Sequence, residues 1–190
     1  MTSTDQQFSQ IAEEAGIEGG ADALYQGTLA LEISEAVAGT SVNPAVMTLE
    51  DIARYEAVER PAVCVDYRIW TVCGMGPPSS GGVTVAQILL LLEGFDMASV
   101  EPGSLEAVHL ISEAERLAYA DRNLYLADSD FVDVPVEALI DEDYLAGRAT
   151  LIDPDASMGE AFPGVIEGWD DAVYAPNAGD HGYSTSHISI

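Results

Sequence analysis

Hydrophobic residues recur at helical spacing in the first part of the chain. Over residues 5–39 the pattern predicts two short helices around the stretch GGADALYQG, whose glycines interrupt regular structure. A further helix is predicted to begin at Thr48, because Asp51 follows three residues later, as in a capping box. The N-terminal part of the chain is therefore expected to be helical.

A strand-like pattern follows over residues 61–73, which are rich in β-branched and aromatic side chains. It predicts two short strands joined near residues 67–68. The next segment, GMGPPSSGG, excludes regular structure until Ser79 or Ser80 caps a helix that ends at Gly94. Because this helix is apolar on nearly every side, we expect it to be central and buried.

The remaining periodicity is helical and then disappears. A long helix is predicted from Ser104 to about Leu126, followed by short helices over residues 136–140 and 141–151. Residues 153–183 contain three prolines, five glycines and seven acidic residues but no lysine or arginine, which predicts a mobile acidic linker. The length and the whole pattern predict one mostly helical domain of the α+β class with a few short strands.

The charge balance is strongly acidic, although the composition is that of a globular protein. The 33 Asp and Glu residues face six basic residues, all arginine, for a formal net charge of −27. Such a surface repels phosphate backbones and anionic membranes, so we expect no nucleic-acid partner. It indicates adaptation to high salt, where a Debye length of ~3 Å screens the repulsion; an acidic interaction surface is the alternative.

The cysteines and histidines do not form a metal or redox motif. Cys64 and Cys73 are too few for a disulfide framework and lack CxxC spacing, so we expect two buried thiols. His109, His181 and His187 show no HExxH or paired spacing. We therefore expect neither a metal nor another cofactor.

Membrane segments are also not expected. The longest apolar stretch, residues 83–92, is interrupted by Thr84 and Gln87 and is far shorter than the ~20 residues that a span needs. The N-terminus is polar and acidic, unlike a signal peptide. The chain is therefore expected to be soluble.

Two local patterns suggest chemistry but have simpler explanations. GMGPPSSGG resembles a phosphate-binding loop before a helix, yet it lacks the lysine of a P-loop, so a turn preceding a helix is favoured. The carboxylate pairs Glu113 with Glu115 and Asp128 with Asp130 are closely spaced, but residues two apart on a helix do not face each other. Both pairs are predicted to be solvated surface.

The last residues of the chain, STSHIS, carry the remaining candidate chemistry. Ser184, Thr185, Ser186 and Ser189 are either nucleophiles or ordinary strand hydroxyls. An acidic connector that leads directly into a hydroxyl-rich strand is typical of a chain that cuts itself at a Ser or Thr. That cut would free the amine of the residue as the base for its own hydroxyl.

These segments together resemble the gamma-glutamyltranspeptidases, which are members of the N-terminal-nucleophile hydrolases. The most specific features are the PPSSGG turn followed by an apolar helix, and AYADR followed by a D-x-D-F-V-x-V-P pattern. The resemblance extends over most of the chain and carries ALYQGTLALEI, MTLEDIARYEAVERPAV, DYRIWTV, GPPSSGGVTVAQILLLLEGFD, EAERLAYADRNLYLADSDFVDVPVEALIDEDYL and STSHISI.

The resemblance implies a precursor that cleaves itself immediately before a threonine. The family pattern Thr-Thr-His-Tyr-Ser aligns with TSHIS, which places the nucleophile, and after cleavage the amine base, at Thr185 and the scissile bond after Ser184. Ser186 and His187 occupy the next two motif positions and are expected to support the site. Ser186 keeps the hydroxyl of the commoner threonine, whereas Ile188 replaces a tyrosine and removes a ring.

The resemblance also implies an αββα sandwich, in which the two cleavage products stay together as a large and a small subunit. Residues 1–184 would then be the C-terminal half of the large subunit, with residues 153–183 as its linker, and residues 185–190 the first strand of the small subunit. The arginine that binds the substrate carboxylate, the groups that hold its amine and the oxyanion-hole glycines would lie outside the chain. The chain alone is therefore expected to be inactive.

The implied activity is transfer of a γ-glutamyl group from glutathione-like donors to water or to amino acids and peptides. Two alternatives stay open, a related amide acylase of the cephalosporin acylase type and a non-catalytic helical interaction module. The resemblance fixes neither the acceptor nor the compartment, although members of the family are often periplasmic or extracellular. A high-salt environment is expected from the acidic composition.

Overall fold

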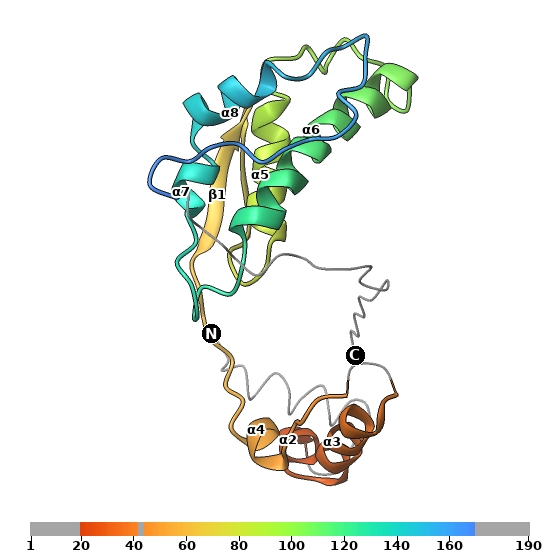
Figure 1. The fold of residues 1–190 in the computed structure, drawn as a ribbon, viewed down its shortest axis with the longest axis vertical. Helices are drawn as coiled ribbons and strands as arrows, with labels where there is room; N and C mark the ends of the chain where they lie inside the picture. The colour runs from red at the N-terminus through yellow and green to blue at the C-terminus, as the bar shows by residue number, and fades with distance from the viewer. Residues whose placement is uncertain (1–19, 42–43, 170–190) are drawn as a thin grey trace. The chain divides into compact units, whose positions relative to one another are not determined.

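The computed structural model describes residues 20–41 and 44–169 (Figure 1). They belong to two compact units. The first unit contains the helices before residue 60, and the second begins at Arg60. Each unit has its own packing and is described separately.

The first unit is a group of short helices, α2 (Gly20–Tyr25), α3 (Thr28–Gly39) and α4 (Leu49–Ala53). Helix α2 occupies the glycine-rich stretch that was expected to separate two helices, and the helix predicted before it lies outside the described residues. The predicted capping box is confirmed: the Thr48 hydroxyl accepts from the Asp51 amide at 3.1 Å, and the Thr48 amide donates to the Asp51 carboxylate at 2.8 Å.

The second unit begins with an antiparallel hairpin, β1 (Ala62–Tyr67) and β2 (Trp70–Met75), which confirms the two predicted strands. The turn consists of Arg68 and Ile69, one residue later than predicted. Arg68 has a φ of 58°, and its guanidinium donates to the Phe95 carbonyl oxygen at 2.8 Å. The turn is thereby tied to the segment that follows α5.

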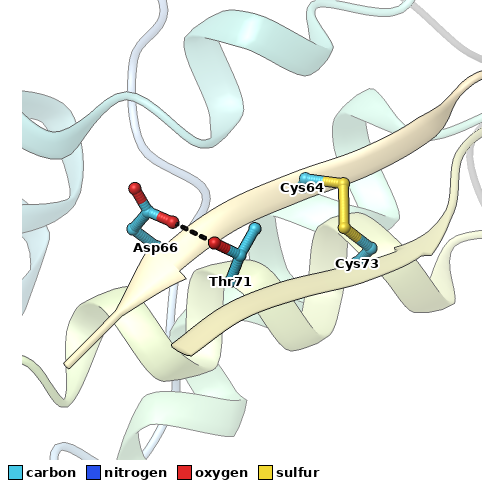
Figure 2. The surroundings of a disulfide bond; sticks show 4 residues. All are labelled: Cys64, Asp66, Thr71 and Cys73. Carbon is cyan, nitrogen blue, oxygen red and sulfur yellow. Dashed lines mark hydrogen bonds between the residues drawn. A yellow bond between two sulfur atoms is a disulfide. The ribbon is translucent and has the colours of Figure 1, made fainter. Parts of the chain in front are cut away.

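The two cysteines form a disulfide across this hairpin, so the expectation of two buried thiols was wrong (Figure 2). Cys64 and Cys73 lie directly opposite each other in the strand register, with their Cα atoms 4.1 Å apart. Both are exposed, on the face that also carries the Asp66–Thr71 hydrogen bond of 2.7 Å. The opposite face, with Val65, is buried.

Helix α5 (Gly81–Leu91) packs against both strands and against the helices that follow. Its first turn touches β2 backbone to backbone: a Cβ on Gly82 would come within 2.8 Å of the Gly74 carbonyl carbon. Ser80 is the N-cap residue, but its hydroxyl does not cap the helix; it accepts from Arg122 Nε at 3.0 Å. The helix ends at Leu91, three residues before the predicted Gly94, and the expectation of a largely buried central helix is confirmed.

Three helices complete the unit, α6 (Leu105–Tyr125), α7 (Val136–Leu139) and α8 (Glu142–Ala149), close to their predicted positions. Ser104 and Asp141 cap α6 and α8 through their side chains. One hydrophobic cluster joins α5, α6 and α8, and contains Leu91, Leu92, Leu110, Ala114, Leu117, Ala118, Leu145 and Ile152. Of the helices in the described ranges, none is long and apolar enough to cross a bilayer.

Candidate functional site

The predicted cleavage residues Ser184, Thr185, Ser186 and His187 lie outside the described residues, and their roles stay predictions. The structure does describe the first part of the segment that leads to them, residues 153–169. This part has no helix or strand beyond an isolated bridge between Asp153 and Ala156. Its attachment to the helices is the site that the structure brings into view.

A buried carboxylate on α6 forms the centre of this attachment. Asp121 is 1% exposed, and each of its two carboxylate oxygens accepts two hydrogen bonds. Oδ1 accepts from the Gly164 amide at 2.8 Å and from Arg148 Nη2 at 3.0 Å. Oδ2 accepts from the Tyr144 hydroxyl at 2.7 Å and from Gln87 Nε2 at 3.2 Å. Four donors, one of them cationic, satisfy a charge that would otherwise be costly to bury.

The side chains that donate to Asp121 come from two helices, α5 and α8, and two of them also bind backbone groups. Arg148 on α8 also donates to the Phe162 carbonyl oxygen at 2.8 Å, and Gln87 on α5 donates to the Leu139 carbonyl oxygen at 2.9 Å. Burial, and then the hydrogen bond to Asp121, raise the pKa of Tyr144 above its ordinary value. The Tyr144 hydroxyl therefore stays protonated and keeps donating at neutral pH.

A second buried carboxylate lies two turns earlier on α6. Glu113 is 2% exposed, and it accepts from the Ser157 hydroxyl at 2.8 Å and from the Met158 amide at 2.7 Å. Burial favours the neutral acid, but these hydrogen bonds and the charge of Arg116 outweigh it and lower the pKa of Glu113. The expectation that Glu113 is solvated surface was therefore wrong, whereas its neighbour Glu115 is exposed, as expected.

The family of the chain follows from a match over nearly its whole length. The gamma-glutamyltranspeptidase family matches residues 4–190. The chain belongs to this family.

The relatives of this chain include proteins named for two activities. It is 46% identical over 175 residues to the glutathione hydrolase proenzyme of Escherichia coli K12, a match that covers 91% of this chain and 28% of the relative. It is 41% identical over 134 residues to the acylase ACY 1 proenzyme of Pseudomonas sp. strain SE83, covering 70% of this chain and 24% of the relative. The chain thus spans about a quarter of the length of these curated relatives.

A solved structure of the family has the same fold. The gamma-glutamyltranspeptidase of Helicobacter pylori is 37% identical, with a TM-score of 0.67 over 78% of this chain and 43% of that one. This likeness confirms the fold class that the resemblance implied, a mostly helical α+β portion of the N-terminal-nucleophile hydrolase fold.

Two segments on which the family resemblance rests, AYADR and PPSSGG, make hydrogen bonds that hold the fold together. AYADR supplies Asp121, the centre of the attachment, and Arg122, which donates to Ser80 of the PPSSGG turn. The Ser79 hydroxyl accepts from the Gly81 amide at 3.3 Å. Both serine hydroxyls of the turn are thus engaged within the protein, which favours a turn preceding a helix over a phosphate-binding loop.

Sequence reasoning missed the buried carboxylates, although the helical pattern contained a signal for one of them. Leu110, Ala114 and Leu117 form a buried stripe on α6, and Asp121 and Tyr125 continue it at the same three- and four-residue spacing. An acidic residue on such a stripe indicates a satisfied buried charge. In the described ranges, no group of three His, Cys, Asp or Glu side chains could hold a metal ion.

Proposed function

We propose that the protein containing this chain is a γ-glutamyltransferase and glutathione hydrolase. The observation that carries the proposal is the family match, which extends to residue 190 and so includes the TSHIS motif. The 46% identity to a glutathione hydrolase proenzyme supports it. Substrates would be small γ-glutamyl compounds, and the partner would be the remainder of the same precursor, held as a large and a small subunit.

The first step is self-cleavage. The Thr185 hydroxyl attacks the Ser184 carbonyl, the Thr185 nitrogen leaves, and an ester replaces the peptide bond. The departing nitrogen takes up a proton and becomes the free α-amine of Thr185. Water then hydrolyses the ester, which frees the Thr185 hydroxyl and leaves a carboxylate on Ser184. An α-amine has a pKa near ~8, so it can accept the hydroxyl proton at neutral pH.

The second step is transfer. The Thr185 hydroxyl attacks the γ-glutamyl carbonyl of the donor, and the donor amine leaves with a proton. The γ-glutamyl ester then passes to water, which is hydrolysis, or to an acceptor amine, which is transfer. Ser186 and His187 are proposed to support this site from the adjacent motif positions.

The isolated chain is proposed to be inactive. By the family resemblance, the groups that bind the substrate and stabilise the oxyanion lie outside residues 1–190. Removing a single oxyanion donor costs ~10²- to 10³-fold in rate, so removing the whole arrangement should leave no measurable turnover.

An amide acylase is the second candidate, and the 41% identity to an acylase proenzyme supports it. Both activities use the same cleavage chemistry, so only the substrate separates them. The processed full-length protein should release the aniline from a γ-glutamyl anilide. If the protein instead releases the amine of an N-acylated β-lactam and releases no aniline from the γ-glutamyl anilide, it is an acylase.

Replacement of the nucleophile tests the cleavage. In the full-length precursor, Thr185→Ala should abolish self-cleavage, because no hydroxyl remains to attack the Ser184 carbonyl. Thr185→Ser should cleave more slowly, and Ser189→Ala, the loss of a nearby hydroxyl, should cleave normally. Intact mass spectrometry follows the two products, and a Thr185→Ala precursor that still cut after Ser184 would disprove the assignment.

A further inference from the structure

Residues 153–166 run alongside α6 in the same direction, and α6 and α8 bind them at successive levels (Figure 1). His109 Nε2 lies 2.8 Å from the Asp153 carbonyl oxygen, and Glu113 binds Ser157 and Met158. Further along, Arg116 donates to the Gly159 carbonyl oxygen at 2.7 Å, Asp121 accepts from the Gly164 amide, and the Tyr125 hydroxyl donates to the Gly164 carbonyl oxygen at 2.7 Å. We call residues 153–166 the docked segment.

Most of these contacts are made to the backbone of the docked segment. The bonded groups are the carbonyl oxygens of residues 153, 159, 162 and 164 and the amides of residues 158 and 164. Backbone contacts fix where the chain runs whatever its side chains are. At its end, Ile166 is 6% exposed in a cluster with Val83, Tyr125 and Leu139, so the docked segment ends at an anchored residue.

We infer that Glu113 and Asp121 are positioning residues for self-cleavage, because they fix the point from which the chain departs toward Ser184. This inference rests on the proposed function. Docking leaves the eighteen residues 167–184 between Ile166 and the scissile bond, in place of the thirty-two residues 153–184. The fully extended reach of the connection falls from ~110 Å to ~60 Å. The direction in which the chain leaves the helices is fixed as well.

Gly164 offers a way to release the docked segment without changing α6. A Cβ at this position would collide with the Tyr144 hydroxyl and come within 2.9 Å of Arg148 Cδ, both of which are held by Asp121. The Gly164→Ala substitution should therefore push the segment off the Asp121 carboxylate. Gly147→Ala is the matched control, because a Cβ on Gly147, in α8, meets no atom within 4 Å.

The test compares the full-length precursor with its Gly164→Ala and Gly147→Ala variants. Self-cleavage is timed by intact mass well below the melting temperature of all three proteins, and turnover of a γ-glutamyl anilide is measured after complete processing. Gly164→Ala should slow self-cleavage by about tenfold or more, since small misplacements distant from the chemistry can cost ~10²-fold. Turnover per processed enzyme should be unchanged, and Gly147→Ala should match the wild type in both measurements.

A purely structural role predicts a different result. It would lower the melting temperature of Gly164→Ala but leave the cleavage rate at low temperature unchanged, and that outcome would overturn the inference. If Gly164→Ala does not fold, Glu113→Gln, which weakens the docking at Ser157 and Met158, should slow cleavage in the same way, and wild-type kinetics there would also overturn it. A wild-type precursor that never cleaves would instead remove the proposed function itself.

Discussion

At the scale of single residues, the two buried carboxylates of α6 differ from the other acidic side chains by what surrounds them. Glu113 and Asp121 are 2% and 1% exposed, and each of their carboxylate oxygens accepts at least one hydrogen bond. Their burial could be predicted only in part, because the donors at Met158 and Gly164 come from more than 40 residues away. Helical spacing places a carboxylate on a stripe, but it does not say which loop will cover it.

Because of Glu113, the unfolding free energy of the protein should decrease at acidic pH. Its pKa is lowered from 4.5 in the folded state, so its contribution is complete above that value and is lost as the pH falls through the lowered pKa. Glu113→Gln should flatten the loss of stability as the pH falls below 4.5, measured as the urea midpoint. Glu115→Gln, an exposed neighbour, should keep the wild-type slope, and a Glu113→Gln variant with that slope would contradict the assignment.

At the scale of elements, most helices and both strands could be predicted because their signals are local. Capping residues begin α4, α6 and α8, and β-branched alternation gives the hairpin. The disulfide was missed because the number and spacing of the cysteines do not indicate one, and the strand register that pairs them depends on the turn. With the turn at Arg68 and Ile69, Cys64 faces Cys73; with a turn one residue earlier, it would face Thr71. A shift of the turn by one residue therefore decides whether the two cysteines face each other and can form a disulfide.

The disulfide should stabilise the hairpin by about 2–3 kcal/mol, because it closes a loop of nine residues' separation in the unfolded chain. The Cys64→Ser/Cys73→Ser double variant should lose that amount of unfolding free energy in a urea titration. Reductant should destabilise the wild type equally and leave the double variant unchanged. Iodoacetamide labelling of both cysteines in protein isolated without reductant would contradict the bond.

At the scale of the whole molecule, the negative charge of the acidic side chains far exceeds what the arginines can neutralise. All six arginines are engaged: five pair with Glu50, Asp130, Glu93, Glu113 or Asp121, and Arg122 donates to Ser80 and Asn123. With 33 acidic residues, most carboxylates must lack a cationic partner. The exposed pairs, such as Arg54 with Glu50, contribute only ~0–1 kcal/mol each, and the pairs of the buried Glu113 and Asp121 involve only two of the 33 acidic residues. These contacts therefore cannot offset the repulsion of a net charge of −27.

Dissolved cations should screen the negative charge that the arginines leave uncompensated. Raising the salt concentration to about 1 M shortens the Debye length to ~3 Å and screens most of the mutual repulsion of exposed carboxylates. We expect a gain of at least about 1 kcal/mol in stability, or ~2–4 °C in Tm, on going from dilute buffer to that concentration of NaCl. The gain should shrink near about pH 4, where many carboxylates are protonated and the charge to be screened is smaller. Thermal unfolding of the chain at the two salt concentrations and at both pH values measures this difference. Equal Tm values in dilute buffer and in molar salt at neutral pH would show that the acidic surface is not an adaptation to salt, and would favour an acidic interaction surface instead.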